Sequence, residues 1–160
     1  MQGLRTVFKD RTILVVEDNP DHVALIEAVI SRSLRGAQVR VALLCEGARR
    51  YLRGDWGAYD DDQQNNPLPD LIVLDLWLPD GTGFELLEWI AGSDWLSDIP
   101  VIMFTASKSE EHARMAKELG VQRYLRKPAN FGSLVAAIKE ELQAADMRRD
   151  SGQQSNSAGH

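Results

Sequence analysis

A short apolar run that ends at an aspartate constrains this chain more than any other feature. Residues 71–74 are Leu-Ile-Val-Leu, and Asp75 follows them directly. An uninterrupted apolar run of this kind is typical of a strand buried on both faces, as in a parallel sheet. Open α/β sheets carry their chemistry at the carboxyl ends of their strands, so Asp75 is a candidate functional residue. The alternative is a solvated loop aspartate, and the remaining sequence argues against it.

Strands and helices alternate along the chain. Strands are expected at residues 12–16, 38–44, 71–74, 99–104 and 121–125. Apolar residues recur at helical spacing after each strand, within residues 23–34, 46–53, 84–90, 109–119 and 131–142. This succession predicts one α/β domain, with a parallel sheet, helices on both faces and right-handed crossovers.

The segments outside this alternation are polar. Residues 54–68 include three consecutive aspartates, but their spacing does not match a calcium-binding EF-hand loop, and a solvated mobile loop is expected. Residues 1–10 are expected to be an N-terminal extension that lacks the apolar core of a signal peptide. From residue 146 to residue 160 the composition predicts a disordered tail, which leaves residues 11–145 as the domain.

Charge and cysteine content argue against several classes of function. The 160 residues carry a net charge of −6, which disfavours binding to nucleic acid or to an anionic membrane surface. No segment reaches the length of a transmembrane helix. Cys45 is the only cysteine and cannot form an internal disulfide, so a reducing, cytoplasmic setting is expected.

Polar side chains follow four of the expected strands. These residues are Glu17 and Asp18, then Asp75, Thr105 and Lys127. Singly they also fit a helix cap, a turn or an edge position, but parallel strands bring all of them to one rim of the sheet. Three carboxylates there would raise one another's pKa values, and a divalent cation, with all-oxygen ligands favouring Mg²⁺, removes that repulsion. Metal, ammonium and hydroxyl then form a cradle for a phosphoryl group that Asp75 can attack.

These motifs resemble those of the receiver domains of two-component response regulators. The matching segments are Val-Val-Glu-Asp-Asn-Pro at residues 15–20, Leu-Asp-Leu-Trp-Leu-Pro at residues 74–79, Gly83, Phe-Thr-Ala at residues 104–106 and Lys-Pro at residues 127–128. The resemblance covers about residues 11–144. It implies a flavodoxin-like (βα)5 fold, with a five-stranded, parallel, doubly wound sheet in strand order 2-1-3-4-5. It also implies a signalling switch rather than an enzyme, although such a switch catalyses its own phosphorylation and slow dephosphorylation.

The resemblance assigns a role to each residue at the rim. Asp75 is implied as the phosphoacceptor and, with Asp18, as a direct Mg²⁺ ligand. The backbone carbonyl of Trp77 is implied as a further ligand, and Glu17 as the acid that holds the metal through water. Lys127 resembles the lysine that contacts the phosphoryl group.

Two further residues resemble the moving parts of such a switch. Thr105 resembles the hydroxyl that moves onto the phosphoryl group, and Tyr124 the aromatic residue that turns inward on phosphorylation. The Lys127–Pro128 peptide bond is implied to be cis, as proline permits.

The chain departs from the family pattern at two positions. Glu17 replaces the commoner aspartate and has a longer side chain. Trp77 is large for a residue so close to the nucleophile, and we hypothesise that it shields the acyl phosphate from water. The alternative is that Trp77 only covers the rim of the site.

The resemblance also implies partners. The phosphoryl donor would be a sensor histidine kinase or a histidine phosphotransfer protein, and the switch would act on a downstream protein. No output domain follows the motifs, which predicts a stand-alone regulator. The loop at residues 54–68 resembles that of regulators paired with bacterial phytochromes. Those proteins often form homodimers through the fourth helix, fifth strand and fifth helix, here roughly residues 106–142.

Three other functions fit parts of the pattern. A degenerate receiver would bind proteins without phosphorylation, but the full set of rim residues argues against it. A haloacid-dehalogenase-like phosphatase needs a second aspartate where this chain has Trp77, and its acidic pair follows its lysine in sequence. A nucleotide- or flavin-binding module is disfavoured because residues 81–83, Gly-Thr-Gly, lack the third glycine of the dinucleotide fingerprint.

Overall fold

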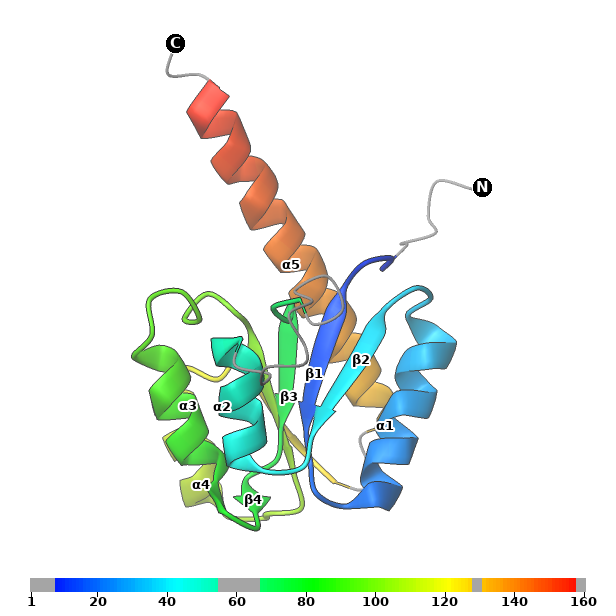
Figure 1. Cartoon of the computed structure of the whole chain (residues 1–160), viewed down its shortest axis with the longest axis vertical. Coiled ribbons are helices and arrows are strands. Elements are labelled where there is room, and N and C mark those ends of the chain that lie inside the picture. The colour runs from blue at the N-terminus through cyan, green and yellow to red at the C-terminus, as the bar shows by residue number, and fades with distance from the viewer. Residues whose placement is uncertain (1–7, 55–66, 128–130, 158–160) are drawn as a thin grey trace.

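Five parallel strands form the centre of the fold (Figure 1). The structure, a computed structural model, describes residues 8–54, 67–127 and 131–157. The strands are β1 (Thr12–Val16), β2 (Gln38–Ala42), β3 (Leu71–Leu74), β6 (Val101–Thr105) and β7 (Arg123–Arg126). They lie in the order β2-β1-β3-β6-β7, and every neighbouring pair is parallel. The predicted order 2-1-3-4-5 is confirmed, since β6 and β7 are the fourth and fifth strands of this sheet along the chain.

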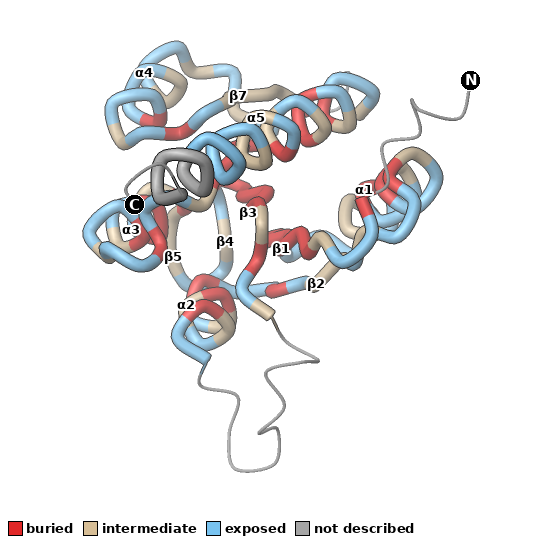
Figure 2. The backbone as a smooth tube through the Cα atoms, turned by 90° about the horizontal axis from the view of Figure 1, so that it is seen from above, coloured by how far each residue is buried: buried red, intermediate tan, exposed pale blue. Residues whose placement is uncertain are grey.

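Helices cover both faces of the sheet (Figure 2). They are α1 (Pro20–Ser33), α2 (Cys45–Arg53), α3 (Gly83–Ala91), α4 (Glu110–Glu118) and α5 (Phe131–Ser157). Successive side chains of a strand point to opposite faces, so β1 contributes to two cores. Its Ile13 and Val15 pack with α1 and α5, whereas Leu14 and Val16 pack with α2, α3 and α4. Within the described residues no helix is both long and apolar enough to cross a membrane.

Most predicted element ends move by one or two residues. Asn19 caps α1, and its side chain accepts a hydrogen bond from the Asp21 amide at 2.9 Å, as the Asn-Pro pair predicts. Strand β6 begins at Val101 rather than at residue 99, because Pro100 has no N–H to give to the sheet. Strand β2 ends at Ala42, which leaves Leu43 and Leu44 exposed.

The turn predicted after β3 contains a small hairpin. Strands β4 (Trp77–Leu78) and β5 (Gly81–Thr82) pair antiparallel, with Trp77 opposite Thr82. Each strand has two residues, too few to show a periodic pattern in sequence. The hairpin begins two residues after Asp75 and therefore lies beside the candidate nucleophile.

The disordered tail predicted from residue 146 is wrong for residues 146–157, where α5 continues to Ser157. The Asp146 carboxylate pairs with Arg11, and Arg149 Nη2 lies 3.2 Å from Asp70 Oδ1. Arg11 also lies 3.6 Å from Asp70. These ion pairs join the helix to the segments preceding β1 and β3. Polar composition misses such an extension because the helix propagates from turns that are already packed on the sheet.

Part of the predicted N-terminal extension belongs to the fold. Phe8 is 3% exposed and packs in the core between the sheet, α1 and α5. Its carbonyl accepts a hydrogen bond from the Arg11 amide at 3.1 Å. The expectations for a mobile loop at residues 55–66 and for the Lys127–Pro128 bond lie outside the described residues.

Candidate functional site

The predicted site residues meet at the carboxyl ends of the strands, which form the lower edge of the sheet in Figure 1. Glu17 and Asp18 follow β1, Asp75 follows β3, Thr105 ends β6 and Lys127 follows β7. One carboxylate oxygen from each of the three acids lies within 4.8 Å of the other two. Because Asp18 is exposed while Glu17 and Asp75 are buried, the cluster opens to solvent on one side.

Lys127 ties this cluster together. Its ammonium is buried, forms an ion pair with Glu17 Oε2 and lies 3.2 Å from Asp75 Oδ2. The third partner is His22 Nδ1 at 3.0 Å. An ammonium has three N–H donors, so each donor has an acceptor. Three contacts, two with carboxylates and one with an imidazole, therefore fix the position of the Lys127 ammonium.

The backbone fixes the position of Asp75. The Leu76 amide donates to Asp75 Oδ1 at 2.7 Å, and the Asp75 amide donates to the Val16 carbonyl at 3.0 Å. Gly83 closes the following hairpin and donates to the Leu76 carbonyl at 2.7 Å. A Cβ at Gly83 would lie 2.5 Å from the Asp75 carbonyl oxygen, so only glycine allows this approach.

Burial dominates the electrostatics of Glu17. It raises the pKa of the Glu17 carboxyl above its ordinary value, and the charge of Asp75 adds to the rise. Hydrogen bonds from Lys127 and from the Asn19 amide, at 3.1 Å, oppose it. The predicted repulsion between carboxylates therefore contributes, but desolvation is the larger cause.

The donor set fits a hard divalent cation. Three carboxylates face one lysine ammonium among the described residues, so the cluster carries excess negative charge when ionised. All-oxygen ligands, few in number and open to water on one side, suit Mg²⁺, which keeps part of its hydration shell. Trp77 follows two residues after Asp75 in β4, with a side chain that is 54% exposed.

The two predicted switch residues differ in their surroundings. Thr105 is fully buried, and its Oγ1 accepts a hydrogen bond from the Ser107 amide at 3.2 Å. Tyr124 lies on β7 opposite Met103, and its buried hydroxyl has no hydrogen-bond partner within the described part of the chain. An unsatisfied buried hydroxyl is costly, so another position of the Tyr124 ring could improve its hydrogen bonding.

Sequence reasoning missed two residues that support the site. His22, in the first turn of α1, accepts from Lys127 across the site. Asp80, in the hairpin, accepts from the amides of Cys45 at 2.7 Å and Glu46 at 2.9 Å and so caps α2 from outside the helix. A histidine three residues after a helix cap that adjoins the acidic pair could have indicated His22, whereas no local pattern indicates Asp80.

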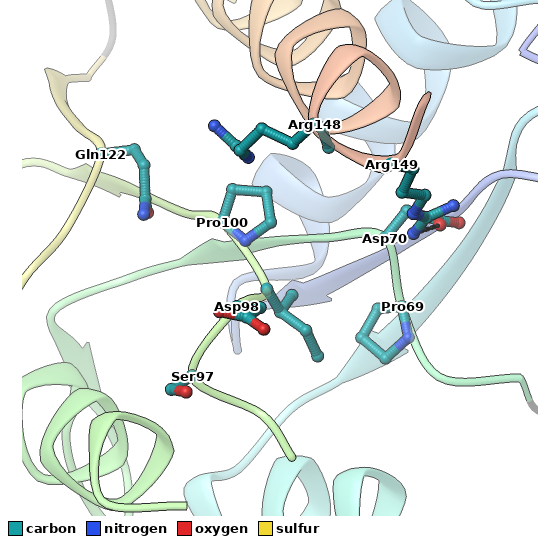
Figure 3. A pocket seen from close by; sticks show the side chains of 10 residues that line it. Pro69, Asp70, Ser97, Asp98, Pro100, Gln122, Arg148 and Arg149 are labelled. Atoms are coloured by element: carbon teal, nitrogen blue, oxygen red, sulfur yellow. Dashed lines mark hydrogen bonds and ion pairs between the residues drawn. The ribbon is translucent and has the colours of Figure 1, made fainter. Parts of the chain in front are cut away.

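A pocket lies at the opposite end of the sheet from the candidate site (Figure 3). It has a volume of about 510 Å³ and is lined by residues that include Asp70, Gln122, Arg148 and Arg149. Figure 3 shows Arg149 directed to Asp70, whereas Arg148 lies on the side of Gln122. None of the predicted site residues lines this pocket.

Comparisons with known proteins agree with this geometry. The family model "Response regulator receiver domain" matches residues 13–139. Response regulator Rcp1 of Synechocystis is 32% identical over 81% of this chain and 84% of its own length. The transcriptional regulatory protein GltR of Pseudomonas aeruginosa is 34% identical over 84% of this chain, which spans 50% of the GltR length. The structure of the phosphorylated cyanobacterial phytochrome response regulator RcpA is 33% identical, with a TM-score of 0.69, and the match covers 81% of this chain and 89% of RcpA. This chain therefore belongs to the receiver-domain family of two-component response regulators.

Proposed function

We propose that Asp75 accepts a phosphoryl group from the phosphohistidine of a sensor histidine kinase or of a histidine phosphotransfer protein. The convergence of Asp75 with the Lys127 ammonium, 3.2 Å away, and with the acidic pair, whose carboxylate oxygens lie within 4.8 Å, carries this proposal. An Asp75 oxygen attacks phosphorus, and the P–N bond of the phosphoimidazole breaks with its electron pair going to the ring nitrogen. Because the other nitrogen of the protonated phosphoimidazole carries the proton, the ring leaves as neutral imidazole. The product is an acyl phosphate on Asp75.

The residues around Asp75 each support this transfer. The Lys127 ammonium, 3.2 Å from Asp75 Oδ2, can pair with an oxygen of the incoming phosphoryl group. The Thr105 hydroxyl is buried at the end of β6 and can turn to donate to another oxygen. Mg²⁺, held by Asp18, Asp75 and the Trp77 backbone carbonyl, and by Glu17 through water, would neutralise charge on the phosphoryl oxygens.

Phosphorylation then changes protein contacts rather than producing a released product. Tyr124 is proposed to turn inward once Thr105 moves, because its hydroxyl lacks a partner in the described residues. The movement of Thr105 and Tyr124 thereby changes the surface formed by α4, β7 and α5. That surface carries ion pairs between Arg126 and Glu110, at 2.9 Å, and between Arg123 and two glutamates of α5. We propose it for a downstream protein or for a second copy of this chain, and light scattering before and after phosphorylation tests the second copy.

Intact-protein mass after incubation with acetyl phosphate tests the acceptor directly. The wild type should gain one phosphoryl group only with Mg²⁺, and Asp75→Asn should gain none. Without an adduct on the wild type, Mg²⁺ titration distinguishes a receiver that needs its kinase from a degenerate receiver that binds no metal. A phosphoryl adduct that persists in Asp75→Asn would contradict the assignment of the acceptor.

A further inference from the structure

His112 joins α4 to the hairpin beside the phosphoacceptor. It lies in the first turn of α4, and its ring meets the Trp77 ring edge-on, with centroids 5.6 Å apart and an interplanar angle of 75°. The same ring meets Phe84 of α3 at 5.8 Å. Such edge-to-face contacts have a preferred geometry and therefore fix where the rings can lie.

The other side of His112 leads to the switch hydroxyl. His112 Nδ1 lies 2.7 Å from Ser107 Oγ, and the Ser107 amide donates to Thr105 Oγ1 at 3.2 Å. Ser107 thus contacts both residues, one through its side chain and one through its backbone. A continuous series of contacts runs from Thr105 through Ser107 and His112 to Trp77, which itself follows two residues after Asp75.

We propose that Ser107 and His112 are positioning residues that couple the Trp77 indole to the Thr105 hydroxyl. The proposal rests on the proposed function, because it requires Thr105 to turn toward a phosphoryl group on Asp75. The position of the Trp77 side chain, and that of the α4 N-terminus, then depend on whether Asp75 is phosphorylated.

The coupling follows from the hydrogen bond that the Thr105 hydroxyl gives up. When its oxygen moves toward the phosphoryl group, the Ser107 amide loses its acceptor at 3.2 Å and must find another. Because Ser107 Oγ is hydrogen-bonded to His112 Nδ1, a shift of Ser107 displaces the imidazole or breaks that hydrogen bond. Either result alters the edge-to-face contact with Trp77, whose indole is 54% exposed and therefore has room to move.

This connection differs from the one through Tyr124. Tyr124 lies on β7 opposite Met103, whereas Ser107 follows β6 and His112 lies in the first turn of α4. A typical net hydrogen bond corresponds to about a 2- to 10-fold change in the ratio of two states. Loss of the Ser107–His112 bond should therefore change the ratio of the two Trp77 positions by that factor, without removing Asp75, Lys127 or a metal ligand.

The test follows the indole N–H resonance of Trp77, identified by its loss in Trp77→Phe, in the full chain. Spectra with Mg²⁺ alone and with Mg²⁺ plus beryllium fluoride, a phosphoryl mimic that binds the acceptor carboxylate, define the two states. Fluorine resonances of the same samples report binding of the mimic. The wild type should show a Trp77 shift on binding. Ser107→Ala and His112→Phe, which keeps an aromatic ring but lacks Nδ1, should bind the mimic with a smaller Trp77 shift, as the 2- to 10-fold change in the ratio of the two positions requires.

Two variants serve as controls. Ser107→Thr keeps the hydroxyl and should restore the shift. Ser93→Ala removes a serine hydroxyl that donates to the Trp89 carbonyl at 2.9 Å, away from the site, and should leave the Trp77 shift unchanged. If Ser107→Ala or His112→Phe fails to fold, the other variant still tests the coupling, because each removes the same hydrogen bond.

The outcomes separate the two proposals. Absence of bound mimic on the wild type contradicts the proposed function. Bound mimic with an equal Trp77 shift in the wild type, Ser107→Ala and His112→Phe overturns the coupling while leaving the acceptor site intact. A shift lost equally in Ser93→Ala would show a general loss of packing and would also overturn the coupling.

Discussion

Replacing Gly83 by alanine should damage both the stability of the domain and the reactivity of Asp75. The added Cβ would lie 2.5 Å from the Asp75 carbonyl oxygen and 3.2 Å from Leu76 Cα. Real Cβ contacts do not approach closer than 3.0 Å, so the backbone beside Asp75 must move by about half an ångström or more. Both atoms in contact are backbone, which cannot rotate away as a side chain could.

The size of both effects can be estimated from this displacement. Overpacking of this kind costs about 1–3 kcal/mol of unfolding free energy, which for a domain of this size lowers Tm by roughly 2–12 °C. A displacement of about 1 Å at reacting atoms can cost about 100-fold in rate, so half of that distance should slow phosphorylation of Asp75 by about 10-fold. Calorimetry and the acetyl phosphate mass assay measure the two quantities separately.

Gly132→Ala is the matched control. Gly132 lies in the first turn of α5, and a Cβ there meets no atom within 4 Å. Alanine at this position should stabilise the helix by about 0.5–1 kcal/mol and leave phosphorylation unchanged. Equal stability and equal phosphorylation of Gly83→Ala and Gly132→Ala would refute the close approach at Gly83.

Three further substitutions and one alkylation experiment test individual residues. Trp77→Asn should shorten the lifetime of the acyl phosphate by up to about 10-fold if the indole excludes water, and an unchanged rate of phosphate release would contradict the shielding hypothesis. His22→Phe should slow phosphorylation by about 5-fold, or roughly 1 kcal/mol, because Lys127 loses an acceptor; a rate equal to the wild type would show that this contact is dispensable. Asp80→Ala should cost about 1 kcal/mol of unfolding free energy. Burial opposes the shift, but hydrogen bonds from the amides at the start of α2 lower the pKa of the Asp80 carboxyl. Urea denaturation should therefore show the stability difference between wild type and Asp80→Ala in full above the ordinary aspartate pKa. The difference should disappear as the pH falls through the lowered pKa of Asp80. Burial raises the pKa of the Cys45 thiol to about 11, two units above its ordinary value of 9.0, so the folded chain holds about 100-fold less thiolate than an ordinary cysteine at neutral pH. Alkylation of the folded chain should therefore be far slower than alkylation in urea.

The sheet and the chemical residues of the site could be predicted because both follow from strands. Apolar runs located the strands, and the residue after each strand had to lie at the common carboxyl edge. That reasoning placed Asp75, Thr105 and Lys127 together without any knowledge of side-chain contacts. The strand order came from the family resemblance instead, and the sheet confirms it.

Contacts between elements that are distant in sequence could not be predicted in the same way. Phe8 lies in the expected N-terminal extension, yet it packs in the core beside α1 and α5. The polar residues of α5 suggested disorder, yet Asp146 and Arg149 pair with residues near the amino ends of β1 and β3. Composition describes a segment by itself, whereas these segments are stabilised by the partners that the fold brings to them.

The supporting contacts of the site share one location, the first turns of the helices. His22 in α1 contacts Lys127, Asp80 bonds the first amides of α2, Gly83 begins α3 beside Asp75, and His112 in α4 contacts Trp77. In a doubly wound sheet every helix after a strand begins at the edge where the strands end, so the first turns surround the reacting groups. The strand ends therefore determine which chemistry is possible. The first turns determine how firmly the reacting groups are held and how their movement reaches the surface, so sequence changes in these turns should tune the switch while its chemistry stays the same.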